Sequence, residues 1–154
     1  MIPSGLISSP LQWFDTGTRR EVDDSIQAAA LAAVININHG SDSNRLLTLE
    51  LNGLPPLITT ITSSQSSLSI LRGVMVLANL AYNNSFCANK IVKSGCHVFV
   101  LEILNISDIS SEHDIIRACF TLFSNLCNNE NSMSFLGSTK GLTERVMKIC
   151  ESSK

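Results

Sequence analysis

Charge is scarce in this sequence. Asp, Glu, Lys and Arg make up only 16% of the 154 residues, and the formal net charge is −2. So weak a field offers no basic surface to the phosphates of nucleic acid, and we expect no nucleic-acid partner. The hydrophobic share of 44% excludes a disordered chain and predicts a packed core. The low charged fraction also indicates that much of the surface is buried or that the chain was cut from a larger array.

Long apolar runs and paired cysteines are also missing. The longest apolar run, Val98 to Leu104, is interrupted by Glu102 and is too short to span a membrane. The first ten residues lack the basic start of a secretion signal, and Leu6-Ile7 is too short for its apolar core. The five cysteines are odd in number and show no paired spacing. We therefore expect free thiols in a reducing compartment, which predicts a cytoplasmic protein with a cytoskeletal association as one option.

Motifs for catalysis and cofactors do not occur. The sequence has no phosphate-binding glycine-rich loop, no nucleophile elbow and no metalloprotease histidine pair. Its three histidines are far apart, and Cys96 and His97 are adjacent in sequence, which does not suit a nucleophile–base dyad. We expect no catalytic residues, no metal site and no cofactor, so the chain is interpreted as non-enzymatic.

What the sequence does contain is an asparagine that recurs in one apolar setting. It lies in Val34-Ile35-Asn36-Ile37, in Leu77-Ala78-Asn79-Leu80 and in Phe123-Ser124-Asn125-Leu126, at intervals of 43 and 46 residues. A glycine follows each asparagine after 16 or 17 residues, at Gly53, Gly95 and Gly141. Self-similarity at this period predicts a helical repeat array, with the glycines in structural turns where left-handed or tight backbone needs them.

The periodicity and the breaks divide the chain into repeats. Residues 1–20 are interpreted as a leader or a partial preceding repeat, and residues 21–152 as the repeat domain. Within that domain we expect a third helix at 21–38, repeats at 41–84 and 85–130, and a partial repeat at 131–152. The predicted helices are 44–51, 57–61, 68–83, 86–93, 98–104, 113–128 and 142–150. The surplus of the longer interval is assigned to a loop insertion at 107–112.

This series of a short helix, a glycine turn, a second helix and a long third helix resembles the armadillo repeat. The resemblance rests on Leu51-Asn52-Gly53-Leu54-Pro55, Leu77-Ala78-Asn79-Leu80-Ala81, Ala88-Asn89-Lys90-Ile91-Val92-Lys93-Ser94-Gly95 and Ser124-Asn125-Leu126-Cys127. It covers about residues 21–150 and implies an all-α fold, a right-handed α-solenoid with two full repeats and flanking partial repeats. HEAT repeats, which lack the short first helix, rank second.

The armadillo resemblance implies a groove in which the asparagines of the third helices hold the backbone of an extended peptide. At about 100° per residue, positions eleven, seven and four before each asparagine and four after it share its face. The predicted partner-binding residues are Asn36, Arg72, Met75, Asn79, Asn83, Asp114, Thr121, Asn125 and Asn129. Two interpretations of the series stay open, because each asparagine can equally bond to its own or a neighbouring helix. Arg72 is expected to be solvated or paired with an acid.

The groove departs from that of the nuclear-import adaptors, which carry a tryptophan four residues before each asparagine. Here those positions hold Ala32, Met75 and Thr121, and the one tryptophan, Trp13, lies outside the repeats. We do not expect a nuclear-localisation-signal binder. The preferred function is a protein–protein interaction scaffold or adaptor that binds an extended peptide or partner helix. The alternatives are a structural component of a larger cytoskeletal or ciliary assembly and a small-GTPase regulator.

Overall fold

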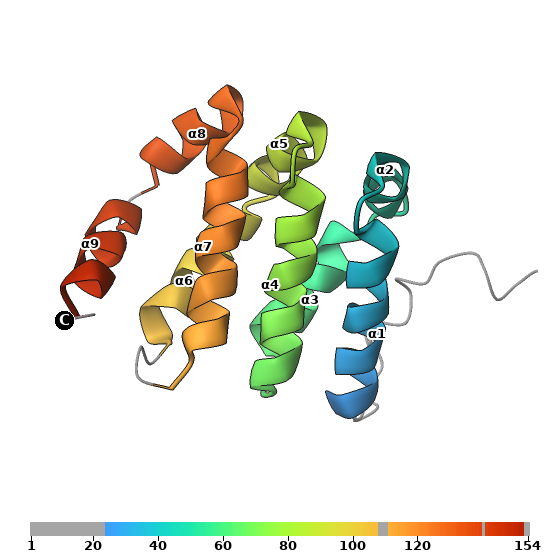
Figure 1. Cartoon of the computed structure of the whole chain (residues 1–154), viewed down its shortest axis with the longest axis horizontal. Helices are drawn as coiled ribbons and strands as arrows, with labels where there is room; N and C mark the ends of the chain where they lie inside the picture. Colours follow the sequence, from blue (N-terminus) through green and yellow to red (C-terminus); the bar gives the residue numbers. More distant parts are fainter. Residues whose placement is uncertain (1–23, 108–110, 140, 153–154) are drawn as a thin grey trace, which may run out of the picture.

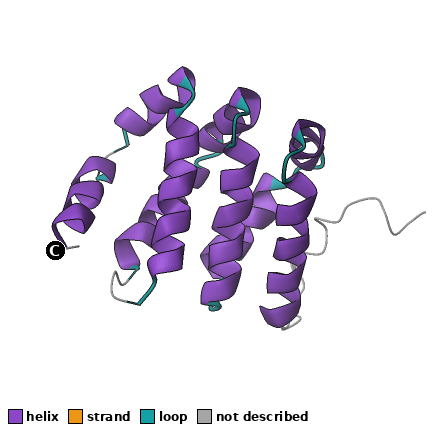
Figure 2. Ribbon diagram, in the orientation of Figure 1, coloured by secondary structure: helices purple, strands orange, loops and turns teal. Residues whose placement is uncertain are grey.

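The computed structural model describes residues 24–107, 111–139 and 141–152; the expected leader at 1–20 lies outside them. Within these ranges the chain forms nine helices and no strand (Figure 2), which confirms the predicted all-α class. The helices are α1 (Asp24–Asn38), α2 (Asp42–Glu50), α3 (Leu54–Ser63), α4 (Ser67–Ala81), α5 (Ser85–Lys93), α6 (Cys96–Ile106), α7 (His113–Cys127), α8 (Glu130–Gly137) and α9 (Leu142–Ser152).

The helices are arranged as an α-solenoid. The three long helices α1, α4 and α7 run side by side in one layer, with α3 and α6 behind them (Figure 1). The short helices α2, α5 and α8 lie across one end of that layer, and α9 follows α8 at the C-terminal end. Helix α4 packs against both α1 and α7, which explains why its sequence is apolar on several sides.

Polar residues at the predicted breaks begin the helices. The side chains of Ser41, Ser66 and Asn84 accept hydrogen bonds from backbone N–H groups in the first turns of α2, α4 and α5. Each such cap satisfies a donor that has no partner within the helix. Helix α3 instead carries proline in its first turn, where the missing N–H has no cost.

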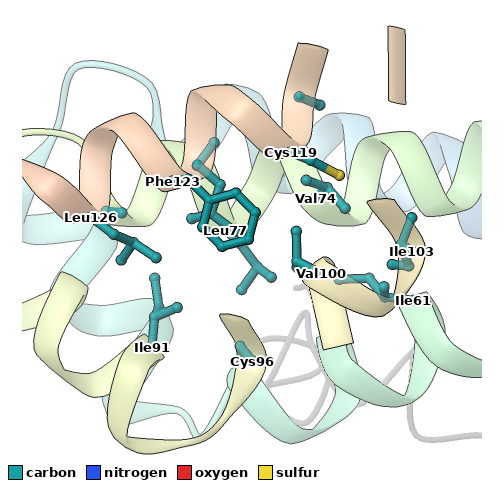
Figure 3. Packing of buried hydrophobic residues seen from close by; sticks show 14 of the residues in the cluster. Ile61, Val74, Leu77, Ile91, Cys96, Val100, Ile103, Cys119, Phe123 and Leu126 are labelled. Atoms are coloured by element: carbon teal, nitrogen blue, oxygen red, sulfur yellow. The ribbon is translucent and has the colours of Figure 1, made fainter. Parts of the chain in front are cut away.

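The core is continuous along the layer. Leu31, Leu57, Leu77, Leu104 and Leu122, from α1, α3, α4, α6 and α7, are all fully buried. Figure 3 shows side chains from α3 to α7 meeting in one shared interior. Because each repeat buries its apolar side chains against the next one, the stability of one repeat depends on its neighbours.

A polar contact joins the short helices of adjacent repeats. Asn84 Nδ2 donates a hydrogen bond to Asp42 Oδ1 at 3.2 Å, and Arg45 Nη1 lies 2.6 Å from the same oxygen. Both hydrogen bonds lower the pKa of the Asp42 carboxyl, and the bond from Asn84 has the larger effect. The buried Arg45 guanidinium lies beneath the Tyr82 ring, 5.7 Å from its centroid.

Gly53 lies in the turn after α2, but it does not have the left-handed backbone that was one of the two conformations predicted for the turn glycines. Asn52 has the positive φ of 58°, whereas Gly53 has a right-handed φ of −72°. Gly53 N–H bonds to Thr48 O and Asn52 N–H to Leu49 O, so the turn is a Schellman motif with Asn52 at its left-handed position. The other two glycines are left-handed, with φ of 79° at Gly95 and 88° at Gly141.

The connection between second and third helices is longer in the second repeat. Three residues, 64–66, join α3 to α4, whereas six, 107–112, join α6 to α7. The difference equals the surplus of the longer asparagine interval, although residues 108–110 of the insertion lie outside the described ranges. Beyond this loop, Arg145 of α9 donates to Leu104 O at 2.8 Å and ties α9 to the end of α6.

Candidate functional site

The recurring asparagines lie at equivalent positions of the three parallel long helices. Asn36 is on α1, Asn79 on α4 and Asn125 on α7, each near the C-terminal end of its helix. Asn79 and Asn125 are half-buried, whereas Asn36 is exposed. The series therefore follows one face of the layer, as the sequence period requires.

Two of the asparagines bond to the long helix of the preceding repeat: Asn125 of α7 bonds to α4, and Asn79 of α4 bonds to α1. Asn125 Nδ2 donates to Ala78 O at 2.9 Å, and Asn79 Nδ2 donates to Ile35 O at 3.4 Å, a longer and weaker bond. Ile35 and Ala78 are each the fourth residue from the end of their helix, where a carbonyl has no intrahelical donor. The side chains thus cap the last turn of the neighbouring helix, which was one of the two interpretations left open.

Each capping carboxamide keeps hydrogen-bonding groups that the cap does not occupy. Each carries two N–H donors and one carbonyl oxygen, and only one donor is bonded to the preceding helix. Within the described residues, the Oδ1 atoms of Asn79 and Asn125 accept no hydrogen bond. One donor and one acceptor per asparagine are therefore left, which is the complement of a peptide unit. Asn36 forms no side-chain hydrogen bond in the same part of the chain.

Arg72 differs from its expected setting. Its Nη1 donates to Ala28 O of α1 at 2.6 Å, so the guanidinium is bound to a backbone carbonyl rather than solvated or paired with an acid. The contact lies nearly two turns before Asn79 on the same side of α4. Arg72 and Asn79 together join α4 to α1.

Four predicted residues line one hollow between α4 and α7. Its volume is about 380 Å³, and its lining is Leu71, Met75, Ala78, Asn79, Asp114, Arg117, Ala118 and Thr121. Its floor is largely apolar, and its rim carries an exposed ion pair, Asp114 Oδ1 to Arg117 Nη1 at 3.7 Å. An exposed pair at this distance contributes little stability, so both side chains can rearrange around a ligand.

A second hollow, of about 330 Å³, lies where α4 and α7 end. It contains the predicted residues Asn83, Asn125 and Asn129, beside Asn84 and Asn128. Asn129 Oδ1 accepts hydrogen bonds from Asn131 N and Ser132 N and so caps α8. Its acceptor is therefore occupied, and Asn129 has only its Nδ2 for a partner. Asn83 is exposed and has a left-handed φ of 47°.

A third hollow lies between α7 and α9 and was not predicted. It measures about 560 Å³ and is lined in part by Ile116, Phe120 and Ile149. Thr121 and Asn125 also border it, so they stand on the ridge between the hollows on either side of α7. Sequence reasoning missed Arg117 and Phe120 because it followed only the face of the asparagines. The Asp114–Arg117 spacing of three residues was the available signal.

Burial shifts the pKa values of several titratable groups among the described residues. Burial raises the pKa of the Cys119 thiol to about 12 and that of Cys87 to about 11, which keeps both thiols protonated at neutral pH. Burial also lowers the pKa of His97, which favours the neutral form of the ring. No three His, Cys, Asp or Glu residues in the described ranges are grouped to hold a metal ion. Among the described helices, none has the length and apolarity that a membrane span requires.

Two solved structures that this chain resembles are designed armadillo repeat proteins. One, in complex with the peptide (KR)4, matches 97% of this chain and 59% of its own with a TM-score of 0.80 at 18% sequence identity. A second matches 97% of this chain and 53% of its own with a TM-score of 0.68 at 19% identity. The chain thus spans a little over half the length of each. These likenesses establish the armadillo-like repeat fold predicted from the sequence. No protein-family model and no curated protein matches the sequence.

Proposed function

We propose that this chain is a non-enzymatic protein-interaction module that holds an extended peptide along the face of α1, α4 and α7. The observation that carries the proposal is the pair of partly used carboxamides. Asn79 and Asn125 each keep one N–H donor and one oxygen acceptor at the edge of a hollow, while the other N–H is fixed to the preceding helix.

The caps make these side chains better ligands. An unconstrained side chain loses about 0.5–1.5 kcal/mol of conformational freedom when a partner immobilises it. A carboxamide already held by a neighbouring carbonyl has lost part of that freedom before the partner arrives. One donor and one acceptor then pair with a peptide unit whatever its side chain, so the contact gives affinity without sequence preference.

Sequence preference comes from the hollows. Leu71, Met75 and Ala78 offer an apolar lining to a side chain entering between α4 and α7. Phe120 and Ile116 offer a second apolar site between α7 and α9. The charged pair on the rim has no net charge, so this groove has no attraction for a basic peptide such as the (KR)4 bound by the designed protein. We expect the preferred peptides to carry spaced aliphatic or aromatic side chains.

Peptide selection followed by a groove-blocking variant tests the proposal. Peptides from a random display library are selected on the full chain and titrated by fluorescence anisotropy against Thr121→Glu and Thr143→Glu. Thr121 borders two hollows and its hydroxyl bonds only within α7, whereas Thr143 is an exposed α9 residue that lines none of the three. Thr121→Glu should weaken binding at least about tenfold, or about 1.4 kcal/mol.

The control variant Thr143→Glu should bind as the parent chain does. Equal binding by Thr121→Glu would refute the groove as the site. If no selected peptide responds to Thr121→Glu and the chain alone scatters light more strongly with concentration, a role in a larger assembly replaces the proposal.

The proposed location is the cytoplasm. All five cysteines are free. Three of them, Cys87, Cys96 and Cys119, are buried, and the last two belong to the hydrophobic core. Buried thiols of this kind persist where glutathione keeps cysteines reduced. Localisation of a tagged chain by microscopy tests this part separately from peptide binding.

A further inference from the structure

One apolar face of α1 is not covered by the other helices of the described residues. Ile26 and Ile37 are 57% and 49% exposed, Ala33 is exposed and Ala30 is only partly buried. Their spacing of four, three and four residues places all four on one side of the helix. Two half-exposed isoleucines on one helix face leave apolar area in contact with water, and a helix packed on this face would bury it.

The equivalent residues of the other long helices show what covers such a face. In α4, 43 residues later, they are Ser69, Gly73, Val76 and Leu80, and all four are buried. In α7 they are Ile115, Cys119, Leu122 and Leu126, and again all are buried. Gly73 lies so close to α3 that an added Cβ would be 2.5 Å from Ile61 Cγ1. This side of a long helix therefore faces the second helix of its own repeat, and among the described residues α1 has no such helix.

We propose that the uncovered face of α1 is the seat of a helix from residues 7–20 of the same chain. In α3–α4 and α6–α7, a second helix of 10 or 11 residues and a connection of three or six residues precede the long helix. The 23 residues before Asp24 are long enough for either arrangement.

The two repeats supply two registers, and both place apolar side chains on the seat. Aligned with α3–α4, Leu11 and Phe14 take the positions of Leu54 and Leu57; aligned with α6–α7, they take those of Val100 and Ile103. Leu57, Val100 and Ile103 are buried and Leu54 is partly buried. Leu11 and Phe14 are thus the side chains that meet the α1 face, whichever connection length applies.

A substitution at Ala29 distinguishes a covering helix of this chain from a long helix of another copy or of a partner. The equivalent of Ala29 in α4 is Arg72, which bonds to the preceding long helix rather than to α3. A covering second helix leaves Ala29 exposed, whereas a preceding long helix from another copy or partner would cover it. Ala29→Glu and Ala33→Glu are the same substitution on the same helix at exposed positions, and only the second lies on the seat.

The experiment moves the one tryptophan of the full chain onto the proposed contact. In the reporter variant, Trp13→Phe is combined with Phe14→Trp, and acrylamide quenching of the indole is measured with sedimentation to fix the oligomeric state. The reporter should be shielded in the monomer relative to the urea-unfolded chain. Ala33→Glu in the reporter should raise quenching to the unfolded value, and Ala29→Glu should leave it unchanged.

Three results would overturn the proposal: full quenching of the reporter in the folded monomer, shielding that depends on chain concentration, or equal effects of the two glutamates. If Ala33→Glu does not fold by circular dichroism, Phe14→Asp replaces it, with hydrogen exchange as the readout. Phe14→Asp should raise exchange in α1 and leave α7 unchanged; unchanged exchange in α1 would also overturn the proposal.

Discussion

Replacing Asn125 by alanine isolates the interhelical cap. The substitution removes the 2.9 Å bond to Ala78 O, which has no other backbone donor because Tyr82 N–H bonds to Asn79 O instead. Ala78 borders the hollow between α4 and α7, so water can reach the carbonyl that is left.

The loss can be estimated from these contacts. A hydrogen bond of this kind contributes about 0.5–1.5 kcal/mol net, and the full penalty for an unsatisfied carbonyl does not apply where water replaces the donor. Alanine gains up to about 0.7 kcal/mol over asparagine in a helix. Asn36→Ala gains the same helix propensity but loses no hydrogen bond, because Asn36 makes no side-chain hydrogen bond in the described residues. The Asn125 variant should therefore be less stable than the Asn36 variant by about 1 kcal/mol.

Urea unfolding followed by circular dichroism measures this difference. Asn79→Ala should fall between the other two variants, because its bond of 3.4 Å is longer. A difference of 1 kcal/mol corresponds to about 2–4 °C in melting temperature for a chain of this size. An Asn125 variant as stable as the Asn36 variant would show that the cap contributes nothing and would refute the reasoning.

Three further predictions concern packing, pH and thiols. Gly73→Ala should destabilise the fold by about 1–3 kcal/mol, because the added methyl group clashes with Ile61. Ile61→Ala should therefore cost less stability in the Gly73→Ala variant than in the parent chain. Additive losses in this double-mutant cycle would contradict the clash. The contribution of Asp42, whose pKa is lowered in the folded state, should be complete above its ordinary pKa of about 3.9 and be lost as the pH falls through the lowered value. Stability should accordingly fall less steeply with acid in Asp42→Asn, and parallel pH profiles would count against the link. In the native chain, the thiols of Cys127 and Cys150 should react rapidly with a disulfide reagent and the three buried ones only on unfolding; rapid reaction of all five would contradict the burial.

The repeat architecture could be predicted because its signals are local. The asparagine period and the capping residues place α4 and α7 within two residues of their observed ends. Helix α3 was predicted too short because Thr62 and Ser63 were assigned to a loop, but their hydroxyls bond back to the carbonyls of Ile58 and Thr59 and stay in the helix. Ser and Thr serve either state, so their presence alone cannot set the boundary.

The site was less predictable because its contacts join residues 44 to 47 positions apart. The sequence identified Asn79 and Asn125 but could not show which atoms each one commits to its neighbour. The acceptor of Arg72 is a backbone carbonyl, which every residue carries and no pattern marks. The hollow between α7 and α9 depends on where Ile149 lies relative to Phe120, and that is set by packing rather than period.

The interhelical caps also have a direction. In both cases the donor belongs to the later helix and the carbonyl to the earlier one, 44 and 47 residues upstream. At a synthesis rate of about 5–20 residues per second, each long helix waits about 2–10 seconds for the residue that completes its last turn. For these two hydrogen bonds, loss of a repeat on the C-terminal side leaves a carbonyl of the long helix before it without its cap, whereas loss on the N-terminal side leaves an asparagine without its acceptor.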